Sequence, residues 1–257
     1  MEIGVLLVGL LAGVMSGLFG IGGGIVMVPI LIAVFGMSML DANAASLGAM
    51  LLPVGVFGVV NYYKAGLINI RESLWISLGL FAGSFFGAEL ALAVNIGLLA
   101  KLYAIFLSYV ALSYFNVQTL IFKRIKKESF EFKEHKPHAF WMFILLGLFA
   151  GVIAGMFGKG GGIIIVPMLI RLFHYNPKAA TATSLAALQL PVGLPSVIVY
   201  AEQGHLNLLY AVLMAGGIVA GTFFGSKLAL KLSAQFFKEI YAVFLLGVAV
   251  YMMVKYI

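Results

Sequence analysis

Long apolar stretches alternate with short polar turns along almost the whole chain. Each half holds four stretches: 3–35, 42–62, 74–94 and 98–122, then 140–173, 180–200, 208–230 and 236–253. A straight helix needs about 20 residues to cross the hydrocarbon core of a bilayer. Most of the stretches have about that length, but the first stretch of each half is longer and contains glycines and a proline. The pattern predicts an all-α membrane protein.

The two halves of the chain repeat one another. Residues 13–29, GVMSGLFGIGGGIVMVP, recur as residues 151–167, GVIAGMFGKGGGIIIVP. The shift that carries Pro29 onto Pro167, called the repeat offset below, holds without a gap toward the C-terminus, where Pro53 falls on Pro191. We therefore predict two homologous membrane repeats, over residues 1–123 and 137–257, joined by a polar linker over residues 124–136.

The distribution of basic residues predicts how the repeats are oriented. The linker is rich in lysine and is expected on the cytoplasmic side. If the stretch 140–173 crossed the membrane once, the basic loop around Arg171 and Lys178 would lie outside. A helical hairpin that returns to its own side would place this loop inside. We prefer the hairpin, which makes the repeats inverted, each a glycine-broken helical hairpin plus three transmembrane helices; a single broken span is the alternative.

Composition supports a membrane solvent rather than water. Charged residues make up 10% of the chain and hydrophobic residues 63%, whereas soluble domains carry roughly 25% charged residues. The net charge of +7 fits basic cytoplasmic loops, so we expect no nucleic-acid partner. We predict a multi-pass protein of the inner (plasma) membrane whose surroundings are the lipid bilayer.

The triple glycines are the strongest candidates for a binding site. Gly22, Gly23 and Gly24 are matched by Gly160, Gly161 and Gly162 in the second half. Consecutive glycines can adopt positive φ and direct main-chain N–H groups into one concavity. The helix that follows would add the partial positive charge of its N-terminus. Paired broken helices at matching positions of two repeats indicate a transporter site, although close helix packing is the alternative explanation.

Several polar residues near these glycines complete the candidate site. Lys159 replaces Ile21 of the first half, and its ammonium group would have to face a cavity, an anion or the membrane interface. The starts of the stretches 42–62 and 180–200 carry neutral polar groups that could hydrogen-bond an oxyanion or, alternatively, bond and cap neighbouring helices. These residues are Asn43, Ser46, Thr181, Ser184 and Gln189.

The doubled motif resembles a known family. Gly-x-Phe-Gly-x-Gly-Gly-Gly-x4-Pro, followed in each half by Ala-x-x-x-Ser-Leu at residues 42–47 and 180–185, resembles the sulfite exporter TauE/SafE family over essentially the whole chain. This resemblance implies a multi-pass permease for sulfite, sulfoacetate or other organosulfur anions.

The residues and the resemblance together predict a secondary transporter that exports a small anion, most simply sulfite or an organosulfonate. Transport would proceed by alternating access around one central site at the two glycine-rich breaks. A passive anion channel is the alternative. We expect no enzymatic activity, because no Ser/His or Asp/Asp pair falls at matching membrane depths. We also expect no cofactor and no metal, and the sequence sets no oligomeric state.

Overall fold

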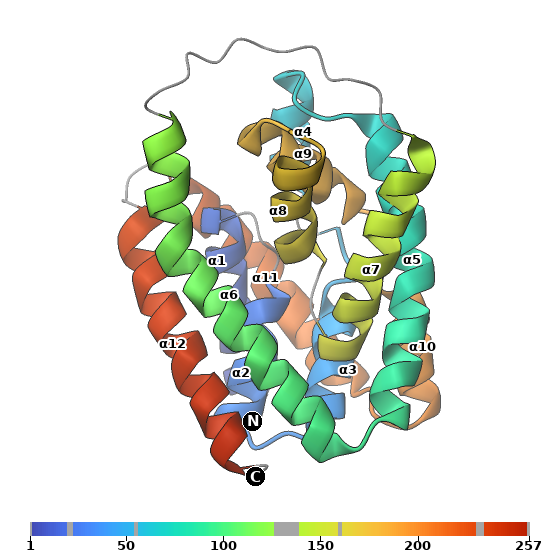
Figure 1. Cartoon of the computed structure of the whole chain (residues 1–257). Helices are drawn as coiled ribbons and strands as arrows, with labels where there is room; N and C mark the ends of the chain where they lie inside the picture. Colours follow the sequence, from blue (N-terminus) through green and yellow to red (C-terminus); the bar gives the residue numbers. More distant parts are fainter. Residues whose placement is uncertain are drawn as a thin grey trace. The chain divides into compact units, whose positions relative to one another are not determined.

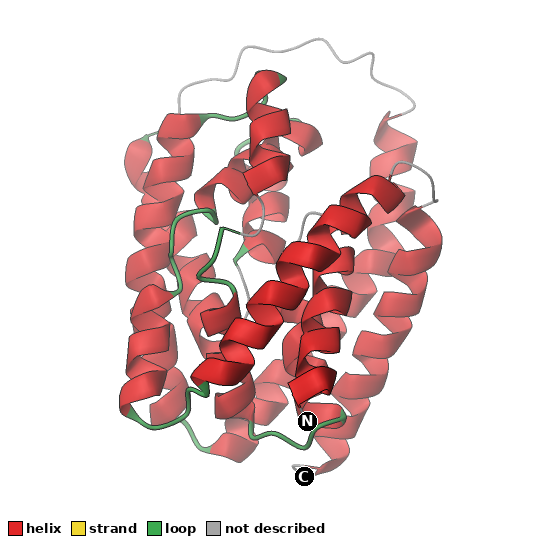
Figure 2. Ribbon diagram, turned by 180° about the vertical axis from the view of Figure 1, so that it is seen from behind, coloured by secondary structure: helices red, strands yellow, loops and turns green. Residues whose placement is uncertain are grey.

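The computed structural model describes residues 2–19, 23–53, 56–125, 139–158, 161–229 and 234–255. Within these residues the helices are joined by turns and loops, and there is no strand (Figure 1, Figure 2). The helices in chain order are α1 (Glu2–Phe19), α2 (Gly24–Ala33), α3 (Met39–Ala49), α4 (Val56–Lys64), α5 (Ile70–Ala93), α6 (Ile96–Ile125), α7 (Phe140–Phe157), α8 (Gly162–Leu172), α9 (Pro177–Ala187), α10 (Leu194–Glu202), α11 (Leu208–Ala229) and α12 (Ala234–Lys255). The predicted linker lies mostly outside the described residues.

The helices form two compact units, and each unit takes segments from both halves of the chain. The first unit comprises Met1–Ala93 with Pro137–Leu230, and the second comprises Val94–Lys136 with Lys231–Ile257. In the second unit α6 packs against α12, with Leu99, Tyr103 and Leu107 buried on the α6 side. The remaining ten described helices belong to the first unit. The boundaries of the two sequence repeats stay a prediction.

The chain reverses direction between α1 and α2. A Cβ atom on Gly23 would lie 3.2 Å from the Cβ atom of Ala12, whereas eleven residues of straight helix would separate them by about 16 Å. Farther along the pair, a Cβ atom on Gly4 would lie 2.7 Å from the ring of Phe35. The start of α1 therefore lies beside the end of α2, as expected of a helical hairpin.

The same reversal occurs between α7 and α8. The rings of Phe143 and Phe173 stack with centroids 4.8 Å apart, which places the start of α7 beside the residue that ends α8. At the other end, a Cβ atom on Gly161 would lie 3.3 Å from the Cβ atom of Ala150. In Figure 1, α8 accordingly runs back in the direction from which α7 came.

The stretches 42–62 and 180–200 are not continuous helices, so the prediction of three unbroken helices per repeat is wrong here. The first is divided into α3 and α4, and the second into α9 and α10. Proline lacks the N–H that continues a helix and clashes with the carbonyl four residues earlier. Pro53 and Pro191 lie between the two parts. Proline combined with a nearby glycine ends the helix outright.

Glycines allow two pairs of long helices to approach at main-chain distance. On α5, a Cβ atom at Gly83 would overlap the carbonyl oxygen of Leu148 on α7. On α11, a Cβ atom at Gly221 would overlap the carbonyl oxygen of Leu10 on α1. The pairs α5–α7 and α1–α11 correspond to each other under the repeat offset. Glycines outside the triple-glycine motif thus serve close helix packing at these positions.

Two helices in the described part of the chain, α5 and α7, are long and apolar enough to cross a membrane by length and composition. The shorter helices on either side of each break have 9 to 11 residues, which corresponds to about 13–16 Å. One such helix reaches only about half way across a hydrocarbon core of about 30 Å.

Adding a methyl group at the α5–α7 contact tests the role of the close glycine packing. Gly83→Ala should lower the free energy of unfolding by about 1–3 kcal/mol, because the helices must separate to admit a Cβ atom. Gly216→Ala on α11 is the control, since nothing lies within 4 Å of its Cβ position. Thermal unfolding of the purified protein in detergent measures both variants, and equal melting temperatures would contradict the proposed close packing.

Candidate functional site

Residues of α3 cap the C-terminal end of α7, at the start of the second glycine motif. Gly158 ends α7 in the left-handed conformation, with φ of 66°. The Nδ2 atom of Asn43 donates to the carbonyl oxygen of Met156 at 2.7 Å, and the hydroxyl of Ser46 donates to the carbonyl oxygen of Gly158 at 2.8 Å. Both side chains are completely buried. The first half of the chain thus holds the glycine turn of the second half.

Tyr200 of α10 adds a third cap to the same end of α7. Its hydroxyl donates to the carbonyl oxygen of Gly155 at 2.8 Å. The last turn of a helix leaves four carbonyl groups without helical partners, and here side chains from α3 and α10 bond three carbonyls at that end. Sequence analysis left two roles open for Asn43 and Ser46: hydrogen bonding to an oxyanion, and bonding or capping of neighbouring helices. In the structure the donor groups of both side chains cap the end of α7. The Oδ1 atom of Asn43 is buried and has no hydrogen-bond partner among the described residues.

The N-terminal ends of α2 and α8 are buried and have no side-chain caps. Gly23 and Gly161 occupy the N-cap positions in the right-handed helical conformation, with φ of −73° and −61°. The expected positive φ is therefore absent at these two glycines and is found at Gly158 instead. The next residues, Gly24 and Gly162, begin the helices and are also buried. Neither N-cap residue has a side chain that could accept a hydrogen bond from the first main-chain N–H groups of its helix.

A small cavity of about 30 Å³ lies where the second glycine motif meets the break between α9 and α10. It is lined by Leu47 and Met50 at the end of α3, Leu80 and Ser84 of α5, Ala154 of α7, Gly161, and Leu188, Val192 and Gly193 of the break. The space is sufficient for about one water molecule. Drug-sized ligand sites are about ten times larger.

The other predicted site residues are distributed around this region. Ser184 on α9 is buried, with 2% of its surface exposed. Gln189 lies at the break after α9 and donates from Nε2 to the carbonyl oxygen of Leu185 at 3.1 Å. Within the described ranges its buried Oε1 atom has no hydrogen-bond partner. Thr181 lies on α9, but its side chain is outside the description. Gly22, Lys159 and Gly160 also lie outside the described residues.

Sequence analysis did not single out a row of serines on α5. Ser73, Ser77 and Ser84 are all buried, and the hydroxyl group of each lies within hydrogen-bond distance of a main-chain carbonyl of α9 or of the break that follows it. Each hydroxyl group is also within hydrogen-bond distance of a carbonyl three or four residues earlier in the chain, so its single proton is shared between two acceptors. Their separations of four and seven residues place them on one face of a helix. That spacing of hydroxyl groups in an otherwise apolar helix is the signal that could have revealed them.

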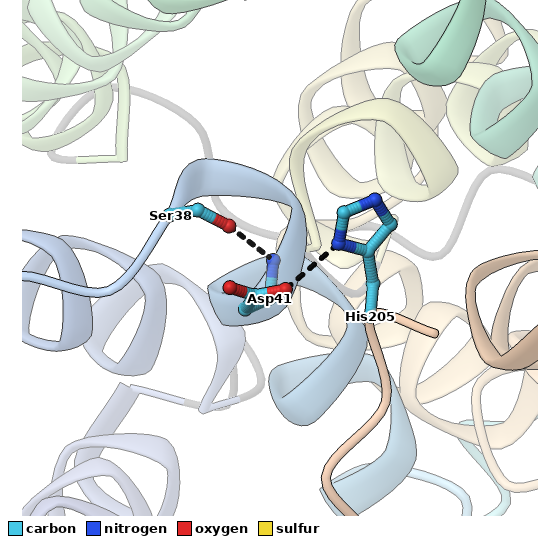
Figure 3. A network of polar contacts seen from close by, with 3 residues as sticks. All are labelled: Ser38, Asp41 and His205. Carbon is cyan, nitrogen blue, oxygen red and sulfur yellow. Dashed lines mark hydrogen bonds and ion pairs between the residues drawn. The ribbon is translucent and has the colours of Figure 1, made fainter. Parts of the chain in front are cut away.

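A second feature missed from the sequence is a polar contact at the start of α3 (Figure 3). Ser38 caps the helix by accepting a hydrogen bond from the N–H of Asp41 at 3.1 Å. The Oδ1 atom of Asp41 lies 2.8 Å from Nδ1 of His205, in the loop between α10 and α11. Asp41 and His205 border an open hollow of the first unit, together with Asn207 and Tyr210. Nowhere in the described part of the chain do three His, Cys, Asp or Glu side chains gather as metal ligands would.

Proteins similar to this chain are described as probable membrane transporters. Probable membrane transporter protein MJ0441 of Methanocaldococcus jannaschii is 30% identical over 247 residues, covering 90% of this chain and 87% of the relative. A Probable membrane transporter protein of Haemophilus influenzae is 30% identical over 273 residues, covering 97% of both chains. Probable membrane transporter protein YunE of Bacillus subtilis is 27% identical over 241 residues, covering 88% and 86%.

The chain is thus a membrane transporter. It belongs to the sulfite exporter TauE/SafE family, whose profile matches residues 5–252. The resemblance noted in the doubled glycine motif is therefore confirmed. No solved structure matches the chain.

The glycine that ends α7 offers a test of the contact between the halves. Gly158→Ala should lower the free energy of unfolding by more than Gly66→Ala, although both positions have positive φ of similar size. A Cβ atom at Gly158 would lie 2.6 Å from Cα of Asn43, whereas nothing lies within 4 Å at Gly66. Gly66→Ala therefore measures backbone strain alone, which costs about 1–2 kcal/mol. Similar melting temperatures for the two variants would contradict the tight contact with α3.

Proposed function

We propose that this transporter exports a small sulfur oxyanion, either sulfite or an organosulfonate, by alternating access. The observation that carries the proposal is the pair of buried, uncapped helix N-termini that begin at Gly24 and Gly162. Each follows a reversal of the chain, and each carries the partial positive charge that favours an anion. The description of the family as sulfite exporters supports the choice of substrate. No catalytic activity and no cofactor is part of this proposal.

We propose the cavity beside Gly161 as the closed form of the substrate site. Three features converge there: the start of α8, the break before α10, and the hydroxyl group of Ser84. Opening of the site would expose main-chain N–H groups of the glycine motifs to an oxyanion. Besides Asn43, the residues proposed to bind it are those predicted from the sequence, namely Gly22, Gly23, Gly24, Ser46, Lys159, Gly160, Gly161, Gly162, Thr181, Ser184 and Gln189.

We further propose that the two halves are inverted repeats in the inner (plasma) membrane, with multiple crossings. Two observations support this arrangement. The chain reverses between α1 and α2 and between α7 and α8, so neither segment crosses as one straight helix. The pairs α1–α11 and α5–α7 are equivalent under the repeat offset. Transporters with repeats of this kind exchange access by rocking one part against another around a fixed site.

Labelling of single cysteines tests the inverted topology directly, because the chain contains no cysteine of its own. Val34 and Leu172 are equivalent under the repeat offset and are 69% and 56% exposed. In inverted repeats, Val34→Cys and Leu172→Cys should react with a membrane-impermeant maleimide from opposite sides of the membrane, Val34→Cys from outside. Reaction of both from the same side would contradict the inverted arrangement.

A binding titration tests the substrate class and the site. Sulfite, thiosulfate, sulfoacetate, taurine, sulfate and chloride are each added to the purified protein, and the shift in melting temperature is measured. A sulfur oxyanion should stabilise the protein, since a ligand bound at 100 times its Kd adds about 2.7 kcal/mol. Gly161→Val should abolish the shift, because its side chain would fill the small cavity, while Gly216→Val in open surroundings should retain it.

Two outcomes would contradict parts of the proposal. If no sulfur oxyanion stabilises the wild-type protein, the substrate class is wrong. If the shift survives in Gly161→Val, the site is elsewhere. Bilayer recordings separate transport by alternating access from a passive channel, because only a channel would carry a steady anion current that does not saturate at low substrate concentration.

A further inference from the structure

The 203–207 loop, between α10 and α11, is built like its counterpart between α4 and α5. Both loops turn at a glycine of positive φ, 75° at Gly204 and 68° at Gly66, and in each the glycine N–H donates to the carbonyl three residues earlier at 3.0 Å. An asparagine side chain then caps the next helix, Asn207 for α11 and Asn69 for α5. Glycine and asparagine, which the two halves share, therefore suffice to form the turn.

The 203–207 loop carries one contact that its counterpart lacks. The Nδ1 atom of His205 lies 2.8 Å from the Oδ1 atom of Asp41, at the start of α3 (Figure 3). Under the repeat offset these two positions correspond to Leu67 and Ala179, whose side chains have no polar group. Because the counterpart loop forms without such a pair, the contact is not needed to build the loop. What it does is join the loop to α3.

The loop and the start of α11 contact α3 again, about two turns farther along. A Cβ atom on Gly48 would lie 3.3 Å from the Cδ1 atom of Leu206 and 3.0 Å from the Cβ atom of Ala211. Asp41 and Gly48 are seven residues apart, so they lie on one face of α3, about 10 Å apart along its axis. This face of α3 therefore packs against the loop and α11.

The other side of α3 faces the glycine turn and the small cavity. Four residues cap the end of α7 or line the cavity: Asn43, Ser46, Leu47 and Met50. They are spaced by three, four and seven residues and so share one face of the helix. With 3.6 residues per turn, this face lies on roughly the opposite side of α3 from Asp41 and Gly48. The helix α3 thus has the loop on one side and the cavity on the other.

The open hollow lies on the loop side of α3. Asp41 and His205 border it, and its volume is about 610 Å³, compared with about 30 Å³ for the cavity. The hollow has space for a small anion, whereas the cavity has space for about one water molecule. Because α3 lies between them, its position relative to the loop decides whether the two spaces are connected.

We propose that the contact between Asp41 and His205 is a latch that holds α3 in the closed position, an inference that rests on the proposed function. When the contact breaks, α3 and the 203–207 loop separate, Leu206 leaves Gly48, and the cavity opens to the hollow. The hollow is then a mouth of the substrate path. Asp41 and His205 are positioning residues, because they act through α3 and do not bind the anion.

The exposure of the latch suits a contact that breaks in each transport cycle. The side chains of His205 and Asp41 are 28% and 40% exposed. A polar contact in such surroundings shifts an equilibrium by about fivefold. It can therefore favour the closed position without preventing the opening that transport requires.

Thiol labelling of the purified protein in lipid nanodiscs tests the latch without substrate and from both sides of the membrane. Leu47→Cys places a thiol at the cavity, where Leu47 is 4% exposed, in a chain that has no cysteine of its own. The rate of its reaction with a polar maleimide measures how often the cavity opens. His205→Leu, which copies the counterpart Leu67, should raise this rate about fivefold, since the closed position loses one hydrogen bond.

Asp41 supplies a second variant and a rescue. Asp41→Ala, which copies Ala179, should raise the labelling rate by about the same factor. Asp41→Asn should label close to the wild-type rate, because its amide oxygen still accepts a hydrogen bond from the imidazole. The double variant Asp41→Ala/His205→Leu should label no faster than either single variant, since each change already removes the same contact.

His174→Asn is the matched control. His174 is an exposed histidine after α8 with φ of 55°, a conformation that asparagine tolerates, so its replacement should leave the labelling rate unchanged. The inference is overturned if His205→Leu labels at the rate of His174→Asn, or if the effects of the two single latch variants multiply in the double variant. If Leu47→Cys does not fold, Met50→Cys provides a thiol at the same cavity.

Sulfoacetate separates the latch from the proposed function, since it does not react with thiols or maleimides. Bound in the cavity, it should slow the labelling of Leu47→Cys. Absence of protection by sulfoacetate overturns its proposed binding at this cavity instead. The labelling rates of the latch variants are measured without substrate, so they still decide whether Asp41 and His205 hold α3 closed.

Discussion

The structure depends on satisfying main-chain polar groups where helices are interrupted inside an apolar environment. Glycines interrupt the segments 3–35 and 140–173, and prolines interrupt 42–62 and 180–200. Each interruption frees carbonyl and N–H groups that lipid cannot hydrogen-bond. The side chains of Asn43, Ser46 and Tyr200 meet this requirement at the end of α7. Side chains from one half of the chain and from α10 thereby become part of the glycine turn of the second half.

Close packing of long helices brings the interrupted helices together. Glycines on α5 and α7 let their main chains meet, and glycines on α1 and α11 do the same. Such contacts depend on the absence of a Cβ atom. In this arrangement α5 packs against α7 of the hairpin α7–α8 and against both parts of the broken helix α9–α10. The small cavity lies at this meeting point. A transporter needs such a place, where short helices end around a space that can open.

The two halves of the chain are related in sequence, but the side chains of α5 and of its counterpart α11 differ in their polar groups. The two halves share an offset over their whole length, and their main helix pairs are equivalent. Hydroxyl groups along α5 nevertheless face the second break, whereas the counterparts of Ser73 and Ser77 on α11 are alanines.

The sequence by itself determined the helical class, the duplicated motif and the family, because apolar run length, glycine and proline act locally and are visible as a pattern. It also indicated the reversal of the chain at the glycines, through the charges of loops such as that at Arg171. It did not show that Pro53 and Pro191 divide helices completely, nor that Asn43 and Ser46 bond a turn more than a hundred residues away. Those outcomes depend on which donor lies opposite each freed carbonyl group, and only the tertiary structure decides that.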